Sequence, residues 1–132
     1  MDIVLYTSFP PTVNSYYVRT RNGVFISSKG RVFRESVIKD VHEQLPGKHI
    51  DYRVMCEVIL FMPDNRKRDV DNYMKGLLDA LQHSDLIADD SLIDQLLIYR
   101  GQVVKYGFAK ITLSLAGPTI PVSERDANLT GE

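Results

Sequence analysis

The sequence lacks several features that would place it in a familiar class of protein. Its single cysteine, Cys56, excludes an intramolecular disulfide. Its three histidines do not have the spacing of a zinc site. It contains no glycine-rich phosphate loop and no nucleophile elbow, and the positions of its residues give no support to Ser-His-Asp catalysis. These absences argue against a disulfide scaffold, a zinc domain, a P-loop protein and a serine hydrolase.

Long apolar runs are also missing, and no segment reaches the length of a transmembrane helix. The N-terminal residues MDIVLYTSFPP have neither the cationic start nor the cleavage site of a secretory signal. We therefore expect a cytoplasmic protein. Its 132 residues, 44% hydrophobic and 25% charged, suit one globular domain with a single core. Cys56 lies within an apolar alternation, which predicts a buried thiol.

The net charge of −1 does not by itself indicate a polyanionic partner. The distribution of charge is more informative, because acidic residues concentrate between Asp69 and Asp90. Basic residues gather elsewhere, at Arg19, Arg21, Lys29, Arg31, Arg34 and Arg66–Arg68. A basic surface around an acidic pocket suits a nucleic acid that must meet a metal ion. The alternative is scattered, solvated charge without a binding role.

Hydrophobic periodicity and turn residues predict an ordered series of helices and strands. Asn22-Gly23 predicts a hairpin turn, and the apolar stripe Val32, Phe33, Val37, Val41 and Leu45 predicts a helix. The expected elements are a strand over 3–7, a hairpin of 16–21 with 24–27, a helix from Ser27 or Ser28 to Leu45, a central strand over 52–62, a helix over 69–82, and strands over 92–104 and 108–115 joined by a turn at 105–107.

This order predicts an α+β fold, with a small mixed or antiparallel sheet and two helices packed on one face. Residues 1–116 should form the domain. Residues 117–132 contain two prolines and little apolar periodicity, and we expect them to be a flexible tail.

The segment from Arg66 to Asp90 carries the residues best suited to chemistry. Three cations precede Asp69 and Asp71, Lys75 follows, and Asp89-Asp90 comes after a helix-length gap. Carboxylates that converge on a divalent cation, beside cations that hold phosphate, can cut a phosphodiester. Cations before a helix are unfavourable, which suggests that an anion outside the chain, such as phosphate, offsets their charge.

Each of these acids also has a structural interpretation. Asp69 and Asp71 can cap the helix, and Asp71 can form a surface ion pair with Lys75. Asp89 and Asp90 are good turn residues, although the loop is long enough for either to face the start of the helix. We expect a structural role for Asp79, one turn further along the helix.

Four motifs carry a family resemblance. They are PPTVNSYY (Pro10–Tyr17), SSKGRVFRESV (Ser27–Val37), RKRDVDNYMKGLLDAL (Arg66–Leu81) and DDSLI (Asp89–Ile93). In this order and spacing the chain resembles, over residues 3–115, the RusA family of Holliday junction resolvases. These are small divalent-metal-dependent endodeoxyribonucleases often found in phages and prophages. A phage-encoded enzyme would work in the host cytoplasm.

The resemblance implies roles for particular residues. Asp69, Asp71 and Asp90 match the family's metal-binding carboxylates, and Lys75 matches its catalytic lysine; these four are the implied catalytic residues. Asn72 and Arg68 match polar residues beside the active site. Leu92 departs from the family, which often has glutamine there. The implied cofactor is Mg²⁺, for which Mn²⁺ can substitute.

The implied activity is the resolution of four-way DNA junctions in recombination and repair, by paired symmetric nicks from a homodimer. The residues expected to contact DNA are Arg66, Lys67, Arg68, Asn72, Arg19, Arg21, Lys29 and Arg31. For the dimer interface we expect apolar residues of the strands, namely Ile59, Leu96 and Ile98. Two alternatives stay open: a nuclease acting mainly on flaps or forks, and a DNA-binding module whose acids only cap and pair.

Overall fold

The computed structural model describes residues 2–130; Met1 of the expected domain and Gly131 and Glu132 of the expected tail lie outside the described residues. Its main sheet has the strand order β1-β6-β4-β5. The strands are β1 (Ile3–Ser8), β4 (Val54–Phe61), β5 (Ile93–Gly101) and β6 (Phe108–Leu115). β5 runs parallel to β4, and the other pairs are antiparallel. The predicted α+β class with a small mixed sheet is confirmed.

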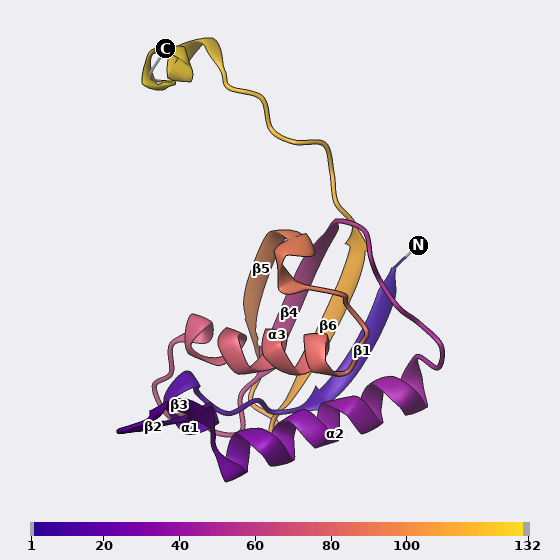
Figure 1. The fold of residues 1–132 in the computed structure, drawn as a ribbon, viewed down its shortest axis with the longest axis vertical. Helices are drawn as coiled ribbons and strands as arrows, with labels where there is room; N and C mark the ends of the chain where they lie inside the picture. The colour runs from indigo at the N-terminus through magenta and orange to yellow at the C-terminus, as the bar shows by residue number, and fades with distance from the viewer. Residues whose placement is uncertain (1, 131–132) are drawn as a thin grey trace.

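The two long helices, α2 (Ser28–Gln44) and α3 (Met74–His83), lie on the same side of the sheet (Figure 1). The predicted start of α2 is correct, because the Ser27 side chain accepts a hydrogen bond from the Gly30 N–H and so caps the helix. Within the described chain, no helix combines the length and apolar composition that crossing a bilayer requires.

β4 is one of the two interior strands of the sheet, as the apolar residues on both of its faces predict. Val54, Cys56, Val58 and Leu60 are buried under the helices, whereas Met55, Glu57, Ile59 and Phe61 are only partly covered. Burial first, and then the nearby charge of Glu57, raises the pKa of the Cys56 thiol to about 12. The expectation of a buried cysteine is therefore confirmed.

A short helix that the sequence did not predict, α1 (Val13–Tyr16), precedes the hairpin of β2 (Tyr17–Thr20) and β3 (Gly23–Ile26). Tyr16 is fully buried between α2 and α3. A Cβ on Gly76 would lie 2.6 Å from the Tyr16 ring, and one on Gly30 would collide with the Tyr16 carbonyl. Glycine at both positions therefore lets the helices close around this tyrosine.

Three sequence predictions need correction. The strand expected over 92–104 ends at Gly101, and the segment after it crosses the end of β4 before the turn expected at 105–107. The Val104 N–H donates to the Met62 carbonyl at 2.9 Å in that crossing. Val32 is 67% exposed and is not part of the buried stripe of α2.

The third correction concerns the expected interface residues. By strand register, Leu96 aligns with Cys56 and Ile98 with Val58, so both lie on the helix-covered face of the sheet. Ile59 lies on the opposite face. The three residues therefore cannot belong to one flat surface, since the side chains of a strand alternate between faces.

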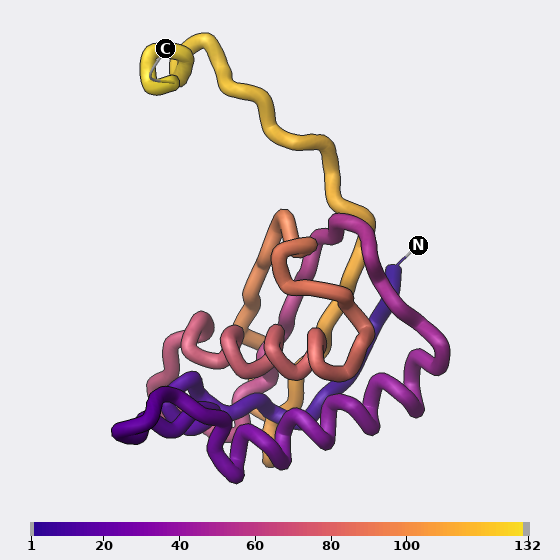
Figure 2. Tube along the Cα trace, in the orientation of Figure 1, coloured from indigo at the N-terminus to yellow at the C-terminus, as the bar shows by residue number. Residues whose placement is uncertain are grey.

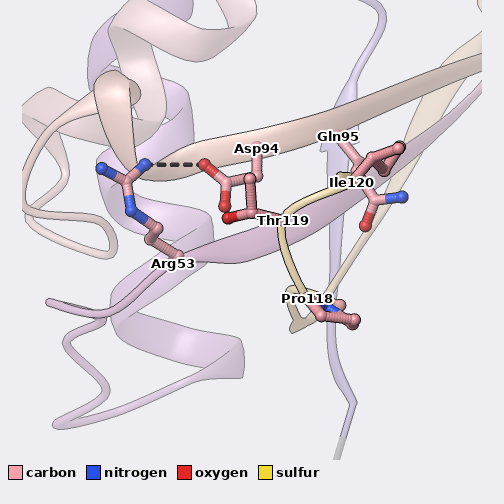
Figure 3. Close-up of a pocket in the computed structure, with 7 residues that line it drawn as sticks. Arg53, Asp94, Gln95, Pro118, Thr119 and Ile120 are labelled. Carbon is pink, nitrogen blue, oxygen red and sulfur yellow. Dashed lines mark hydrogen bonds and ion pairs between the residues drawn. The ribbon is translucent and has the colours of Figure 1, made fainter. Parts of the chain in front are cut away.

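The chain leaves the sheet after β6 and extends away from it (Figure 2). The first tail residues, Pro118–Ile120, lie beside Asp94 and Gln95 of β5, where Arg53 pairs with Asp94 at 2.6 Å (Figure 3). Further on, Ser123 caps a single 3-10 segment, η3 (Glu124–Leu129). Ile120 and Leu129 are 85% and 84% exposed, so these apolar residues of the tail add nothing to the core.

Candidate active site

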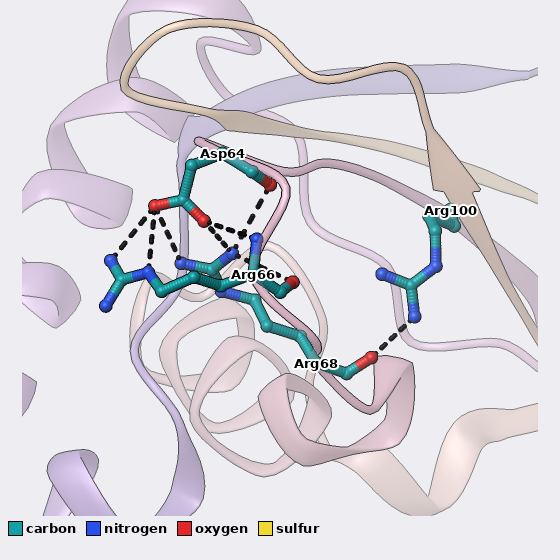
Figure 4. Close-up of polar contacts among 4 residues, drawn as sticks. All are labelled: Asp64, Arg66, Arg68 and Arg100. Atoms are coloured by element: carbon teal, nitrogen blue, oxygen red, sulfur yellow. Dashed lines mark hydrogen bonds and ion pairs between the residues drawn. The ribbon is translucent and has the colours of Figure 1, made fainter.

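The loop between β4 and α3 is organised by Asp64. Its carboxylate accepts hydrogen bonds from Arg66 Nη2 at 2.9 Å and from Arg68 Nη1 at 2.5 Å (Figure 4). These two guanidinium groups, that of Arg68 first, hold the pKa of Asp64 well below its ordinary value. Arg100 of β5 donates to the Arg68 carbonyl at 2.5 Å. The loop is thereby fixed to the end of the sheet.

This arrangement changes the interpretation of the three consecutive cations. We expected an anion from outside the chain to offset them, but Asp64 supplies one from within. The Arg66 side chain is 77% exposed and can still reach a phosphate, whereas that of Arg68 is 13% exposed and mainly holds the loop. Within residues 2–130, Lys67 makes no ion pair.

Asp69 and Asp71 lie directly after this loop, where the chain enters η1 (Val70–Tyr73), a 3-10 turn that leads into α3. The predicted single α-helix from Asp69 therefore begins one turn later. Asp69 occupies the N-cap position, yet its side chain makes no capping hydrogen bond. Both carboxylates are exposed, and among the described residues neither has a hydrogen bond or an ion pair. The capping interpretation is thus not supported for Asp69.

Lys75 is exposed on the first turn of α3. The surface ion pair between Asp71 and Lys75 is not formed in the described part of the chain, so the Lys75 ammonium is available to an external anion. Asn72 is partly buried, and its backbone N–H donates to the Asp69 carbonyl at 3.2 Å. That bond helps to hold the turn carrying Asp69 and Asp71.

The second acidic pair lies at η2 (Asp90–Leu92), beside the other end of α3. The Asp90 N–H donates to Gln82 Oε1 at 3.3 Å, and the Asp89 carboxylate accepts a hydrogen bond from the Ser91 hydroxyl. Asp89 thus fits its turn interpretation. The Asp90 carboxylate is exposed and, among residues 2–130, has no hydrogen bond or ion pair.

Among residues 2–130 no group of three His, Cys, Asp or Glu side chains lies close enough to hold a metal ion. Asp90 is held near the last turn of α3, and a ten-residue helix is about 15 Å long. The assignment of Asp69, Asp71 and Asp90 as metal ligands therefore stays a prediction. The donor chemistry fits, because exposed carboxylates without internal partners are the ligands that Mg²⁺ prefers.

Asp79 has the structural role that we expected. Its carboxylate accepts hydrogen bonds from the Tyr16 hydroxyl and from Arg34 Nη2, the latter at 2.8 Å. His83 Nε2 lies 3.7 Å from the other Asp79 oxygen. These contacts connect α1, α2 and α3 on the side of α3 that faces the hairpin.

The remaining cations predicted to contact DNA lie on the hairpin and the first turn of α2. Arg19 and Arg21 are exposed on the hairpin, and Lys29 and Arg31 are exposed on α2. None of them makes an ion pair within the described residues. They are therefore free to meet phosphate groups, which supports their assignment without testing it.

Sequence reasoning missed Asp64 and the partners of Asp79. Asp64 lies two and four residues from Arg66 and Arg68, and this closeness in sequence was a usable signal for a local ion-pair network. No sequence signal identified Arg34 or Tyr16, because they lie 45 and 63 residues from Asp79.

Comparison with known proteins identifies the family. A model described as endodeoxyribonuclease RusA matches residues 8–114. The chain belongs to the RusA family. One relative, the crossover junction endodeoxyribonuclease of Enterobacteria phage HK97, is 35% identical over 99 residues, covering 75% of this chain and 82% of its own. The Aquifex aeolicus enzyme of the same name is 34% identical over 94 residues, covering 70% of this chain and 75% of its own.

The corresponding RusA enzyme of Escherichia coli K12 is 28% identical over 109 residues, covering 83% of this chain and 91% of its own. The match of the RusA family model ends before the tail, which begins after β6. The predicted family membership is thus confirmed, and the segment carrying Asp69, Asp71, Lys75 and Asp90 lies within the matched region.

Proposed function

We propose that this protein is a metal-dependent endodeoxyribonuclease that resolves four-way DNA junctions. The observation that carries the proposal is the set Asp69, Asp71, Asp90 and Lys75, all exposed and without internal ion pairs in the described chain. Three neighbouring acids, Asp64, Asp79 and Asp94, are instead paired with arginine side chains. Membership of the RusA family supports the same activity.

In this proposal Asp69, Asp71 and Asp90 hold the divalent cation. When bound, the cation supplies Lewis-acid chemistry at the scissile phosphate. Lys75 contributes positive charge that stabilises the phosphate as negative charge develops on it. Arg66 and Lys67, exposed on the preceding loop, bind the backbone on either side and make affinity depend on salt.

The substitution Asp71→Asn tests the assignment, since it keeps the shape of the side chain and removes its charge. We expect cleavage of a synthetic four-way junction in Mg²⁺ to fall at least about a hundredfold, while binding to the junction is nearly unchanged. Asp51→Asn is the matched control, because Asp51 is an exposed carboxylate outside the proposed site. Cleavage by the Asp71→Asn protein at the rate of the wild type would exclude Asp71 as a ligand.

Lys75→Ala separates the two roles within the site. We expect slow cleavage together with unchanged Mg²⁺ binding, measured by calorimetry. Two alternatives are decided by substrate. A nuclease for flaps or forks would cut a fork faster than a mobile four-way junction under equal conditions, and a non-catalytic binder would cut neither.

Paired nicks require two active sites, and the described chain carries one acidic segment. We therefore propose a two-fold homodimer. Since the described residues do not bring three carboxylates together, a second copy could also supply the carboxylate that completes the metal site.

The uncovered face of the sheet is the best surface for this contact. Tyr6, Ile59, Leu97, Tyr99 and Phe108 lie there, and Phe61 stacks on Phe108 with ring centroids 4.3 Å apart. Glu57 and Lys110 share this face, and within the described residues neither forms an ion pair. A two-fold axis through the face would let Glu57 of each copy meet Lys110 of the other.

A further inference from the structure

A groove of about 430 Å³ lies where β1 ends, against the first turns of α2 and the loop that crosses the end of β4. Its walls include Phe9, Pro10-Pro11, Lys29, Val32 and Tyr106. The volume is within the range of sites that hold small organic groups. None of the residues that line it is acidic, although the chain has 17 Asp and Glu residues.

Tyr106 gives the groove an unusually accessible aromatic ring, since the residue is 79% exposed. Its φ of 72° is a left-handed conformation that non-glycine residues rarely adopt. The next residue holds this geometry: the Gly107 N–H donates to the Val104 carbonyl at 2.7 Å, and a Cβ on Gly107 would lie 2.8 Å from the Phe61 carbonyl oxygen. The loop thus presents the ring from a fixed backbone.

Positive charge flanks the ring. Lys105 Nζ lies over one face of the Tyr106 ring, 5.2 Å from its centroid, and Lys29 also lines the groove. Within the described residues neither lysine makes an ion pair. An aromatic platform beside free cations is the combination that binds a nucleobase together with its phosphate.

The groove adjoins the candidate active site. Phe9 lines it, and the Phe9 ring packs against Tyr73 of η1 with centroids 5.0 Å apart. Tyr73 follows Asp71 by two residues. The turn that carries Asp71 is therefore connected to the wall of the groove by a packed aromatic pair.

We propose that this groove holds one nucleotide displaced from the base stack of branched DNA, its base against Tyr106 and its phosphate near Lys29 and Lys105. The proposal rests on the proposed function and adds a recognition element to it. A base at the centre of a branch has lost one stacking neighbour, so extracting it costs less than in a continuous duplex. The groove would accordingly favour branched over linear DNA.

Tyr106→Leu tests the stacking contact, because it keeps an apolar side chain and the same backbone strain while removing the ring. Binding of a four-way junction, titrated without divalent cation, should weaken between about fivefold and a hundredfold. Binding of a linear duplex should be unchanged, and Tyr106→Phe should bind the junction as the wild type does. Tyr52→Leu is the matched control. Tyr52 is 43% exposed and lies just before the start of β4, whereas the loop that carries Tyr106 crosses the end of that strand.

A plot of the logarithm of the junction-binding constant against the logarithm of salt concentration should have a slope that is about one unit shallower for Lys29→Gln than for the wild type. Lys48→Gln should leave this slope unchanged. Ultraviolet cross-linking from iododeoxyuridine at the branch point should map to Tyr106. Equal junction binding by wild type and Tyr106→Leu would overturn the groove proposal and leave the nuclease intact. A wild-type protein that neither binds nor cuts junctions would overturn both proposals.

Discussion

At the scale of single residues, the hydroxyl of Tyr16 makes polar contacts with residues far from it in the sequence. It donates to the carboxylate of Asp79, which also accepts a hydrogen bond from Arg34. The Asp79 side chain of α3 therefore connects α1 with α2. Burial first, and then the hydrogen bond to Asp79, raises the pKa of Tyr16 well above the ordinary value. The phenol is therefore protonated in the folded protein under conditions in which it would begin to ionise in the unfolded chain.

We predict that Tyr16→Phe lowers the free energy of unfolding at pH 7 by about 1–2 kcal/mol, since Asp79 loses one of its partners. The raised pKa means that the stabilisation is complete below pH of about 10 and is lost as the pH rises further. The difference between wild type and variant should therefore shrink above pH 10 in denaturant titrations. Tyr52→Phe, at an exposed tyrosine, should change neither quantity; a pH-independent difference for Tyr16→Phe would contradict this account.

At the scale of elements, the sheet and the tail differ in how far their apolar side chains are buried. Leu113 of β6 is 2% exposed and aligns with both Ile3 and Cys56, whereas Ile120 and Val122 of the tail are 85% and 62% exposed. Apolar side chains that stay in water contribute no burial energy to folding. The tail is also outside the region matched by the family.

We predict that deleting residues 117–132 changes the unfolding midpoint by less than about 2 °C and leaves junction cleavage unchanged, as measured by calorimetry and a nicking assay. A longer deletion that starts at Leu113 is the contrasting variant. It should fail to fold, because it removes a strand residue that packs in the core. Loss of solubility or of the dimer in the shorter deletion would show that the tail makes a contact with another chain.

At the scale of the whole molecule, the sheet is covered by helices on one side only (Figure 1). An apolar face that is left partly open usually meets another surface. Tyr6 and Tyr99, each 47% exposed, flank Lys110 and Ile59 in one row across that face. The side chains of this row and the neighbouring Glu57 make the face self-complementary, which suits a second copy of the chain.

We predict a dimer by light scattering at micromolar concentration. Glu57→Lys and Lys110→Glu should each weaken it, because like charges then meet across the two-fold axis, and the double exchange should restore it. If neither the two single variants nor the double exchange changes dimer formation, the interface lies on another surface. A stable monomer that still makes paired nicks would contradict the two-chain proposal itself.

The sequence by itself determined the local structure and the family. Some features depend only on neighbouring residues: the Ser27 cap of α2, the alternation of β4 and the hairpin that Asn22-Gly23 predicted. The structure has all three, although the hairpin turn lies one residue earlier than predicted, at Arg21-Asn22. The segment Arg66–Asp90 carried most of the resemblance to the RusA family, because its residue types and their spacing are specific. That pattern can be recognised without knowing how the rest of the chain folds.

Only the tertiary structure decided the strand order, the burial of Tyr16 and the partners of the charged residues. β5 pairs in parallel with β4 and not with β6, because pairing depends on how the crossing loop passes the end of β4. Arg34 and Tyr16 reach Asp79 across long stretches of sequence, and the groove beside Tyr106 is assembled from three distant segments. Such contacts depend on packing in three dimensions, which local periodicity and capping do not encode.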